Sequence, residues 1–303
     1  MKFIDPKVEW WPQKSIVQQI AQVGRICYKT KGKQPPENLT GEERESFEYK
    51  RDLERIRGFW QSWHRSMYRH GTCYFFIPND KKLHAIHIWS LMVASPYIDY
   101  AVKGSQVWIS TNMQFMCEHE DFKQVLEPYA IDEDAFIEKA LKVQCLEALW
   151  LLRMTMVVTT QISTSRELNR TSPNAIAEQS TRYCNLQKKG GVQIARPHWY
   201  ADGKLLQRFW FTLGCKVSSW IYNRLLGAGL PPEDARGVLP LDTYTVVAYT
   251  YSVSEWKHIL DLRYFGKTGK PHLNAKEVCG QIGGIIHDRM RQYDPNFIID
   301  RIK

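Results

Sequence analysis

The sequence predicts an α+β fold, in which helices and strands follow one another without the regular alternation of a parallel α/β sheet. Apolar residues recur at helical spacing in several segments, and short runs rich in β-branched and aromatic residues lie between them. The chain has 303 residues, of which 44% are hydrophobic and 24% charged, as in ordinary globular proteins. This length and composition indicate a folded protein of one large or two ordinary domains.

Two helices are predicted near the N-terminus. Ser15 and Gln18 form a capping box at the start of the first helix. Its apolar face is formed by Ile16, Ile20, Val23 and Cys27. The polar segment 31–46, which contains a Pro-Pro pair, is predicted as an exposed loop. A highly charged helix is expected at about 43–63.

The middle of the chain contains predicted strands and one long helix. Aromatic residues dominate 72–77, which is predicted as a buried strand. It is followed by a short helical run over 83–94, a turn at Ser95-Pro96 and a strand over 107–109. Asp132 then caps a long helix with acidic residues in its first turn. One face of this helix carries Phe136, Ala140, Val143 and Leu146.

The second half of the chain continues this mixture. Strands are predicted over 154–159 and 245–251, and helices over 163–170, near 216–227 and from Pro231-Pro232 to just before Leu239-Pro240. Ser254 caps a helix that runs to Arg263. Asn274 and Glu277 form the capping box of a final helix, whose inward residues are Val278, Ile282, Ile285 and Ile286.

The charge balance favours an anionic partner. The 41 Lys and Arg residues against 32 Asp and Glu give a net charge of +9, which suits a nucleotide, a nucleic acid or a membrane surface. No apolar run reaches the roughly 18 residues of a spanning helix, and the N-terminus lacks the apolar core of a signal peptide. The seven Cys residues contain no CxxC pair and are typical of reduced thiols. We expect a cytoplasmic protein without a membrane partner.

Residues that could bind a metal do not form the pattern of a metal site. His84 and His87 are close in sequence, and segment 117–121 combines Cys, Glu, His, Glu and Asp. Neither group is matched by a second pair elsewhere, as zinc sites usually require. No metal is expected, and the cluster at 117–121 is interpreted as solvated surface.

A dense polar cassette at 165–185 is the most informative part of the chain. It lies between apolar segments and contains several Arg, Glu and hydroxyl side chains together with Gln179. An arginine can donate two hydrogen bonds to a phosphate, and Ser and Gln can pair with the edge of a base. The cassette therefore predicts a phosphorylated ligand, with a hydrated loop as the alternative.

The cassette resembles the signature of the flavin-dependent thymidylate synthases, whose core commonly reads ELVRHRxASxxxESxRY. In an ungapped alignment the matching residues are Glu167, Leu168, Arg170, Ser180, Arg182 and Tyr183. Four further blocks follow in the family's order: 20–28 is similar to AxxARxCY, 63–70 to GHxSxxEH, 235–241 to ARxxLPL, and 250–263 to TxNxREWRHFFxLR. No single block is decisive, but the ordered set is specific.

This resemblance implies a fold and an activity. The fold is an α+β domain with a mixed sheet and surrounding helices, assembled as a homotetramer whose active sites are shared between subunits. Such enzymes use reduced FAD and methylenetetrahydrofolate to place a methyl group on C5 of dUMP, with NADPH as a candidate reductant. The chain would be one catalytic domain over 1–303 with a family-variable insertion at about 78–153.

The nucleotide side of the family site is retained. The resemblance assigns substrate binding to Glu167, Glu178, Gln179, Ser180, Arg182, Arg236 and Arg263. Within this set Ser180, Arg182 and Arg263 are candidate catalytic residues. Taken singly, each arginine would be interpreted as half of a surface salt bridge, so the prediction rests on the ordered match. It favours a mononucleotide over a nucleic acid as the partner.

The flavin side of the family site departs from the pattern. The candidate cofactor residues are His64, Ser66, Arg170, Thr171, Ser172 and His258. The family's RHR triplet is Arg-Thr-Ser at 170–172, and Arg69 replaces an acidic residue that faces FAD in relatives. Losing a cation beside a pyrophosphate costs about 1–3 kcal/mol. FAD is therefore expected to bind weakly, in another pose, or not at all.

Three functions follow from these observations. The first is FAD-dependent conversion of dUMP to dTMP. The second is hydroxymethylation of dUMP or another pyrimidine nucleotide on the same fold, because hydroxymethyl transfer requires no net hydride. The third is a non-catalytic homologue that binds a nucleotide or a nucleic acid, which would suit the pI of about 9.1 and the 11 Trp residues.

Overall fold

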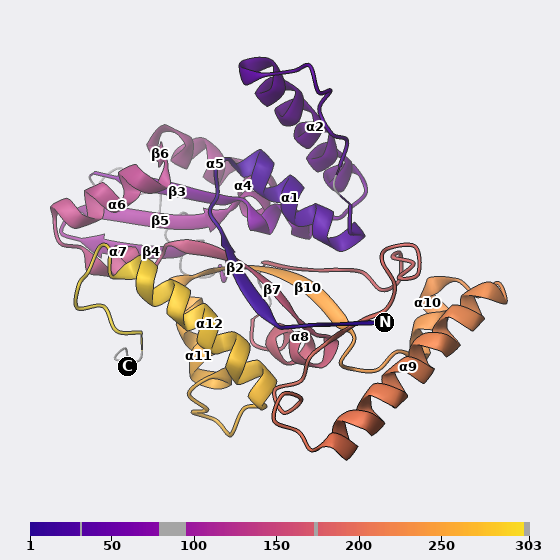
Figure 1. The fold of residues 1–303 in the computed structure, drawn as a ribbon. Helices are drawn as coiled ribbons and strands as arrows, with labels where there is room; N and C mark the ends of the chain where they lie inside the picture. Colours follow the sequence, from indigo (N-terminus) through magenta and orange to yellow (C-terminus); the bar gives the residue numbers. More distant parts are fainter. Residues whose placement is uncertain (31, 79–94, 173–174, 300–303) are drawn as a thin grey trace.

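The computed structural model describes residues 1–30, 32–78, 95–172 and 175–299. Within these residues the strands form two four-stranded antiparallel sheets and one parallel pair, and helices pack on the four-stranded sheets (Figure 1). The predicted α+β class is confirmed. The predicted helical run at 83–94 lies outside the described residues.

The first sheet has the strand order β2-β7-β10-β8 and positions most of the candidate site. Its strands are β2 (Lys7–Trp11), β7 (Arg153–Gln161), β10 (Tyr244–Ser252) and β8 (Ala175–Glu178). The two central strands pair over their whole length, with Tyr244 opposite Gln161 and Ser252 opposite Arg153. One face is covered by α1 (Ile16–Tyr28), and the other by α8 (Ile162–Asn169), α11 (Val253–Arg263) and α12 (Leu273–Met290).

The second sheet has the order β4-β5-β3-β6. Its strands are β4 (Asp99–Lys103), β5 (Gln106–Asn112), β3 (Thr72–Ile77) and β6 (Ala130–Ile131). One face packs on α4 (Met113–Glu118) and α5 (Glu120–Leu126), with η3 (Glu127–Tyr129) following, and the other on α6 (Glu133–Lys142) and α7 (Leu146–Leu149). The short strands β1 (Lys2–Ile4) and β9 (Gln193–Ala195) form the parallel pair.

One hydrophobic core joins the two four-stranded sheets. It contains Trp108 from the second sheet, Met156 from the first and Trp256 from α11, each at most 1% exposed. The indole Nε1 of Trp256 donates to the backbone oxygen of Met154 at 3.1 Å, so this buried polar group is satisfied. The sheets are therefore held together by burial of apolar surface.

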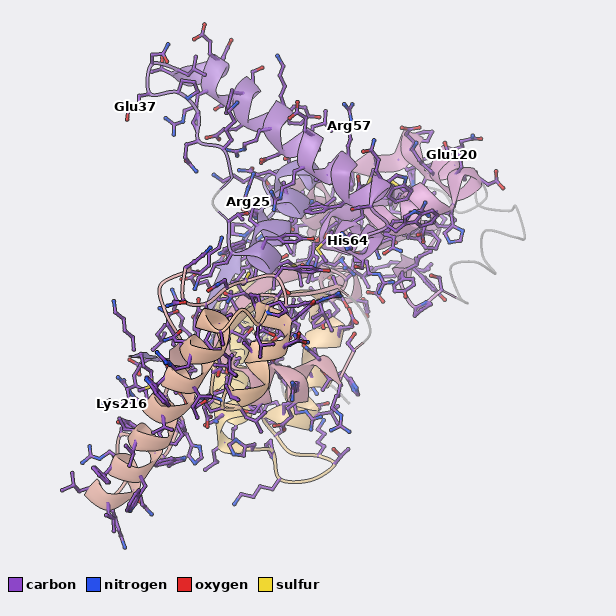
Figure 2. The ribbon with its side chains drawn as sticks, turned by 90° about the vertical axis from the view of Figure 1, so that its right-hand side faces the viewer. Arg25, Glu37, Arg57, His64, Glu120 and Lys216 are labelled. Carbon is purple, nitrogen blue, oxygen red and sulfur yellow. The ribbon has the colours of Figure 1, made fainter. Side chains whose placement is uncertain are left out.

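Two long helices project from this body (Figures 1 and 2). Helix α2 (Gly41–Gln61) leads into η1 (Arg65–His70), and α9 (Leu205–Gly227) leads into α10 (Pro232–Ala235) and η4 (Arg236–Val238). Among the described residues, no helix combines the length and apolar character needed to cross a membrane. All seven cysteines are free thiols.

Several predicted boundaries are wrong for local reasons. The predicted long helix after Asp132 is two helices, because Gln144 adopts a left-handed φ of 54° and ends the first. Ser252 caps α11 in place of Ser254, and His272 caps α12 in place of Asn274, whose side chain instead accepts from the backbone N–H of His198. Helix α2 begins inside the segment predicted as a loop.

The contact between α1 and α2 depends on Gly24. A Cβ at this position would lie 2.3 Å from Cζ of Phe59, so in the Gly24→Ala variant the Phe59 ring or the helices must shift. We expect it to lose about 1–3 kcal/mol of unfolding free energy in urea denaturation. Gly58→Ala in α2 is the matched control, because a Cβ there meets nothing within 4 Å and helix propensity predicts a gain of up to about 1 kcal/mol. Equal stabilities would contradict the packing argument.

Candidate functional site

The edge strand β8 carries the centre of the predicted site. It pairs antiparallel with β10, with Glu178 opposite Val247, and its hydrogen bonding continues from the Gln179 N–H to the Val246 oxygen at 2.8 Å. Successive side chains of a strand point to opposite faces of its sheet. Glu178 consequently faces α8, and Gln179 faces the side covered by α1.

The Glu178 carboxylate is held by three donors. Its Oε1 accepts from Ser165 Oγ at 2.7 Å and from Thr245 Oγ1 at 3.0 Å, and its Oε2 accepts from Asn169 Nδ2 at 3.2 Å. Asn169 in turn accepts from the Tyr249 hydroxyl at 2.8 Å. This network ties β8 to α8 and β10 and gives Glu178 a fixed orientation next to the helix that carries Glu167.

Glu167 and Arg263 form a second part of the predicted set. Oε1 of Glu167, on α8, lies 3.6 Å from a terminal nitrogen of Arg263, the last residue of α11, and both side chains are about one quarter exposed. The Nε of Arg263 is buried and makes no hydrogen bond within the described chain. This guanidinium is therefore fixed by one carboxylate while part of its hydrogen-bonding capacity is unused.

Arg182 and Arg236 form the third part, at the surface where α9 and α10 meet the cassette. Nε of Arg182 donates to Oε2 of Glu233 at 2.6 Å, and Nε of Arg236 donates to the backbone oxygen of Glu233 at 3.0 Å. A terminal nitrogen of Arg236 also donates to Thr181 Oγ1 at 2.9 Å. Both guanidinium groups therefore converge on one residue, and one of them pairs with its carboxylate.

Ser180 lies between these parts. Its hydroxyl oxygen accepts from the backbone N–H groups of Arg182 at 3.1 Å and Tyr183 at 3.2 Å, and its own N–H donates to the Cys27 oxygen at 2.9 Å. Both contacts use the Ser180 oxygen as acceptor, so the hydroxyl proton can be donated to a ligand. Within the described residues, no hydrogen bond or ion pair joins Arg182 or Arg236 directly to Glu167 or Arg263.

The candidate cofactor residues are dispersed. His64, Ser66, Arg170 and His258 are exposed; His64 follows α2 (Figure 2) and its Nδ1 lies 3.2 Å from Ser62 Oγ. Thr171 donates to the Leu168 oxygen at 2.5 Å, and the buried Ser172 donates to Glu255 Oε1 at 2.8 Å.

The surroundings of Ser172 do not fit a flavin pyrophosphate. The hydroxyls of Thr171 and Ser172 donate to acceptors of the chain itself. The Glu255 carboxylate also accepts from the Ser252 N–H at 3.4 Å, and the nearby Asp99 carboxyl has its pKa raised by burial. The Glu255 carboxylate beside Ser172 would repel a pyrophosphate. The hydroxyls of Thr171 and Ser172 are thus not available to an anion in this arrangement.

Metal-binding side chains do not converge in the part of the chain that the structure describes, where no three His, Cys, Asp or Glu residues are grouped as a metal ion would require. Glu118, His119, Glu120 and Asp121 are exposed, as the solvated-surface interpretation of 117–121 predicts. His84 and His87 lie outside the described residues.

A family model described as thymidylate synthase complementing protein, Thy1, matches residues 98–289, well over half of the chain. The chain belongs to this family. It is 25% identical over 151 residues to a probable flavin-dependent thymidylate synthase of Paramecium bursaria Chlorella virus 1, covering 44% of this chain and 68% of that protein. It is 48% identical over 42 residues to a flavin-dependent thymidylate synthase of Halobacterium salinarum, covering 14% of this chain and 17% of that one.

Solved structures with partial similarity include the UMP/dUMP methylase PolB of Streptomyces cacaoi. The form with 5-Br UMP has a TM-score of 0.41 and 22% identity, covering 52% of this chain and 81% of that chain. The form with 5-Br dUMP has a TM-score of 0.40 and 23% identity, covering 52% and 77%.

Sequence reasoning did not anticipate the partners of the arginines. Glu233 and Thr181 contact Arg182 and Arg236. Glu233 lies outside the family motifs, and Thr181 occupies a variable position of the cassette motif. The position of Glu233, four residues after Gly229 at the start of α10, gave no signal of its role. Only the folding of α10 against the cassette brings it beside the arginines.

Proposed function

We propose that this Thy1-family protein transfers a one-carbon unit from methylenetetrahydrofolate to C5 of dUMP. The observation that carries the proposal is the convergence of Arg182 and Arg236 on Glu233 beside the Ser180 turn. A phosphate accepts charge-assisted hydrogen bonds from two guanidinium groups better than a single carboxylate does. The nucleotide phosphate would displace Glu233 from Arg182.

The chemical difficulty of the reaction is the weak nucleophilicity of uracil C5. The activated ring shares negative charge between C5 and O4 before C5 attacks the methylene carbon, and fixed cationic donors stabilise that charge. Arg263, oriented by Glu167, is our candidate for this role, and Ser180 would orient the ring by donating its hydroxyl proton. Glu178 acts as a positioning residue, because its oxygens are already engaged by the chain.

Product analysis by mass spectrometry tests the proposal. The protein is incubated with dUMP, methylenetetrahydrofolate, FAD and NADPH, and the nucleotide product is identified. A gain of a methyl or a hydroxymethyl group supports one-carbon transfer. No product with any reductant would refute the proposal and favour the nucleotide-binding, non-catalytic alternative.

Hydroxymethyl transfer is the second candidate, and the bonding of Ser172 to Glu255 favours it. In that reaction C5 bonds to the methylene carbon and loses its proton, the folate nitrogen leaves, and water adds to the resulting exocyclic methylene. The products are 5-hydroxymethyl-dUMP and tetrahydrofolate, so no hydride is consumed. A methyl product requires a hydride in addition, which reduced FAD supplies in the family. Purified protein without a flavin absorption spectrum, but with hydroxymethyl product, would support this candidate.

We also propose that the active site is completed between subunits of a homo-oligomer. Residues Leu206, Trp210, Leu213, Val217 and Trp220 of α9 follow a 4-3-4-3 spacing and are 39–65% exposed. This spacing forms one stripe, as in helices that pack side by side. The opposite side of α9 packs on the body through Cys215 and Tyr222. A second copy covering the stripe would bring together arginine groups that one chain keeps apart.

Charges introduced into the stripe should break the oligomer. We expect Trp210→Glu combined with Trp220→Glu to yield monomers in sedimentation velocity and to lose turnover. Tyr49→Glu in α2 is the control, because it adds a charge at an aromatic residue that is 53% exposed outside the stripe. A Trp210→Glu/Trp220→Glu variant with unchanged mass and turnover would count against the shared site.

The chain is proposed to be a single catalytic domain over 1–303, with 78–153 as a family-variable insertion. The core shared by the two sheets supports this, since Trp108 of the insertion packs in the same cluster as Trp256.

A further inference from the structure

A stack of three aromatic rings and one guanidinium group lies where α2 ends and η1 begins. The rings of Tyr68 and Trp60 are 5.1 Å apart, and the guanidinium carbon of Arg65 lies 4.4 Å from the centre of the Trp60 ring. The same carbon lies 4.1 Å from the centre of the Trp63 ring. The inner end of the stack is fixed, because Tyr68 is buried and its hydroxyl donates to the Ile56 oxygen at 2.9 Å. Its outer end is Trp63.

Trp63 presents its indole to solvent. The residue is 76% exposed, and within the described ranges no ring or cation other than Arg65 contacts it. Its backbone has a φ of 62°, in the left-handed region that bulky residues rarely adopt. The family motif GHxSxxEH, aligned at 63–70, begins with glycine, which adopts this conformation without strain. A strained backbone that presents an exposed aromatic ring favours a role in binding.

The surface around Trp63 is cationic. Segment 50–70 contains six Lys and Arg residues against two Asp and Glu. One of the two acids, Asp52, is already paired with two arginines. Arg57 is exposed on α2 (Figure 2), and neither Arg57 nor Arg65 makes a hydrogen bond or an ion pair with any residue that the structure describes. Both guanidinium groups can therefore bind phosphates.

An open stacking face of this kind does not fit a mononucleotide. Small ligands bind in concave sites that bury most of their surface, whereas the outer face of Trp63 is flat and solvated. Surfaces that bind single-stranded nucleic acid combine exposed rings, on which bases stack, with cations that bind the phosphates. The first half of α2, with four Glu and one Arg over 41–49, would repel a polyanion. The binding surface is thus confined to the second half of α2 and to η1.

From these contacts we propose that this surface binds single-stranded nucleic acid. A base stacks on the outer face of Trp63 and extends the order Tyr68, Trp60, Arg65, Trp63 by one ring. Phosphates of the same strand are bound by Arg65 and Arg57. The surface shares no residue with the Arg182/Arg236 pair, and the proposal does not require the protein to be a one-carbon transferase.

Fluorescence anisotropy of a labelled oligodeoxycytidylate of about 15 nucleotides tests the proposal with the full chain. Cytosine is chosen because it is not the base of the proposed substrate. We expect Trp63→Gly to weaken binding about tenfold or more. Glycine also relieves the left-handed backbone, so this loss would not come from misfolding. Tyr49→Ala is the matched control and should leave the affinity unchanged, because Tyr49 is a 53% exposed aromatic residue in the acidic half of α2.

The salt dependence of the same binding tests the phosphate contacts. Each phosphate that a cation neutralises adds about 0.7 to the slope of log affinity against log salt concentration for a single strand. Arg57→Ala should reduce the slope by about this amount. Arg44→Ala should not change it, because Arg44 lies in the acidic half of α2 and pairs with Glu48. Equal slopes for the two variants would overturn the assignment of Arg57.

Four results would overturn the proposal itself. The first is equal affinity of the unmodified protein and Trp63→Gly. The second is a duplex that binds as tightly as the single strand, because paired bases cannot stack on the indole. The third is displacement of the oligonucleotide by FAD or polyglutamate at equal concentration, which would indicate a flavin subsite or a surface for an acidic protein. The fourth is loss of binding in Arg182→Ala/Arg236→Ala, which would place the strand at the proposed nucleotide site. None of these results depends on turnover, which tests the proposed function.

Discussion

Replacing Arg182 and Arg236 together with alanine will weaken binding of dUMP at the shared site by about 100-fold or more, because each charge-assisted hydrogen bond contributes roughly 1.5–3 kcal/mol. The two guanidinium groups already converge on Glu233, so the loss of either leaves only part of the phosphate contact. Equilibrium binding of dUMP by calorimetry, at fixed ionic strength, measures the effect.

Two further variants sharpen this result. Arg196→Ala removes an arginine that pairs with Asp5 at the surface, and it should leave the affinity unchanged. Glu233→Gln removes the carboxylate that competes with phosphate for Arg182, and it should tighten binding. If the double alanine variant binds dUMP as well as the Arg196→Ala control, the phosphate is not at this pair.

Lowering the pH will destabilise the protein through His70. This side chain is 0% exposed, and its Nδ1 lies 2.8 Å from the Thr250 hydroxyl. Burial, followed by the nearby charges of Arg153 and Arg69, lowers its pKa to about 3, against about 6.5 in the unfolded chain. The folded protein therefore resists protonation that the unfolded chain accepts. The stability contributed by neutral His70 is fully present above about pH 6.5 and declines as the pH falls towards about 3.

The expected loss from this histidine is about 3 kcal/mol of unfolding free energy at about pH 4, relative to about pH 7. Urea denaturation at the two pH values measures it. His70→Asn provides the comparison, because an amide can hydrogen-bond to Thr250 but does not titrate. The variant should lose about 3 kcal/mol less than the wild-type protein over this range. The same pH dependence in both proteins would show that His70 is not responsible.

Local sequence signals predicted most of the interior elements. The aromatic run at 72–77 is β3, the Ser15 side chain caps α1 by accepting from the Gln18 N–H, and Asp132 caps α6. These elements form where neighbouring residues alone specify the conformation. Short strands such as β1, β8 and β9 escaped prediction, because they exist only through pairing with partners distant in the chain.

Helix α9 shows why apolar periodicity can mislead. It begins at Leu205, well before the predicted start near residue 216. One stripe of apolar residues packs on the body, and a second stripe on the opposite side is exposed, so the helix lacks a clear polar face. A pattern that is apolar on two sides does not resemble an ordinary amphipathic helix.

The candidate site could be predicted as a set of residues but not as an arrangement. The family motifs identified Arg182, Arg236, Glu167 and Arg263, and the structure places them as two pairs. Motif order cannot show that Glu233 pairs with one arginine, or that Ser172 donates to Glu255. Such contacts depend on how α10 and α11 pack against the cassette.

The alternation of Glu178 and Gln179 at the end of β8 has a consequence for how the protein can change. On one face of the sheet Glu178 binds β8 to α8 and β10. On the other face Gln179, at the end of the same strand, lines a cavity together with Lys29. Deleting or inserting a single residue in β8 would exchange the two roles at once, burying an amide against α8 and a carboxylate beside Lys29. We therefore expect sequence changes in β8 to be substitutions that keep the length of the strand.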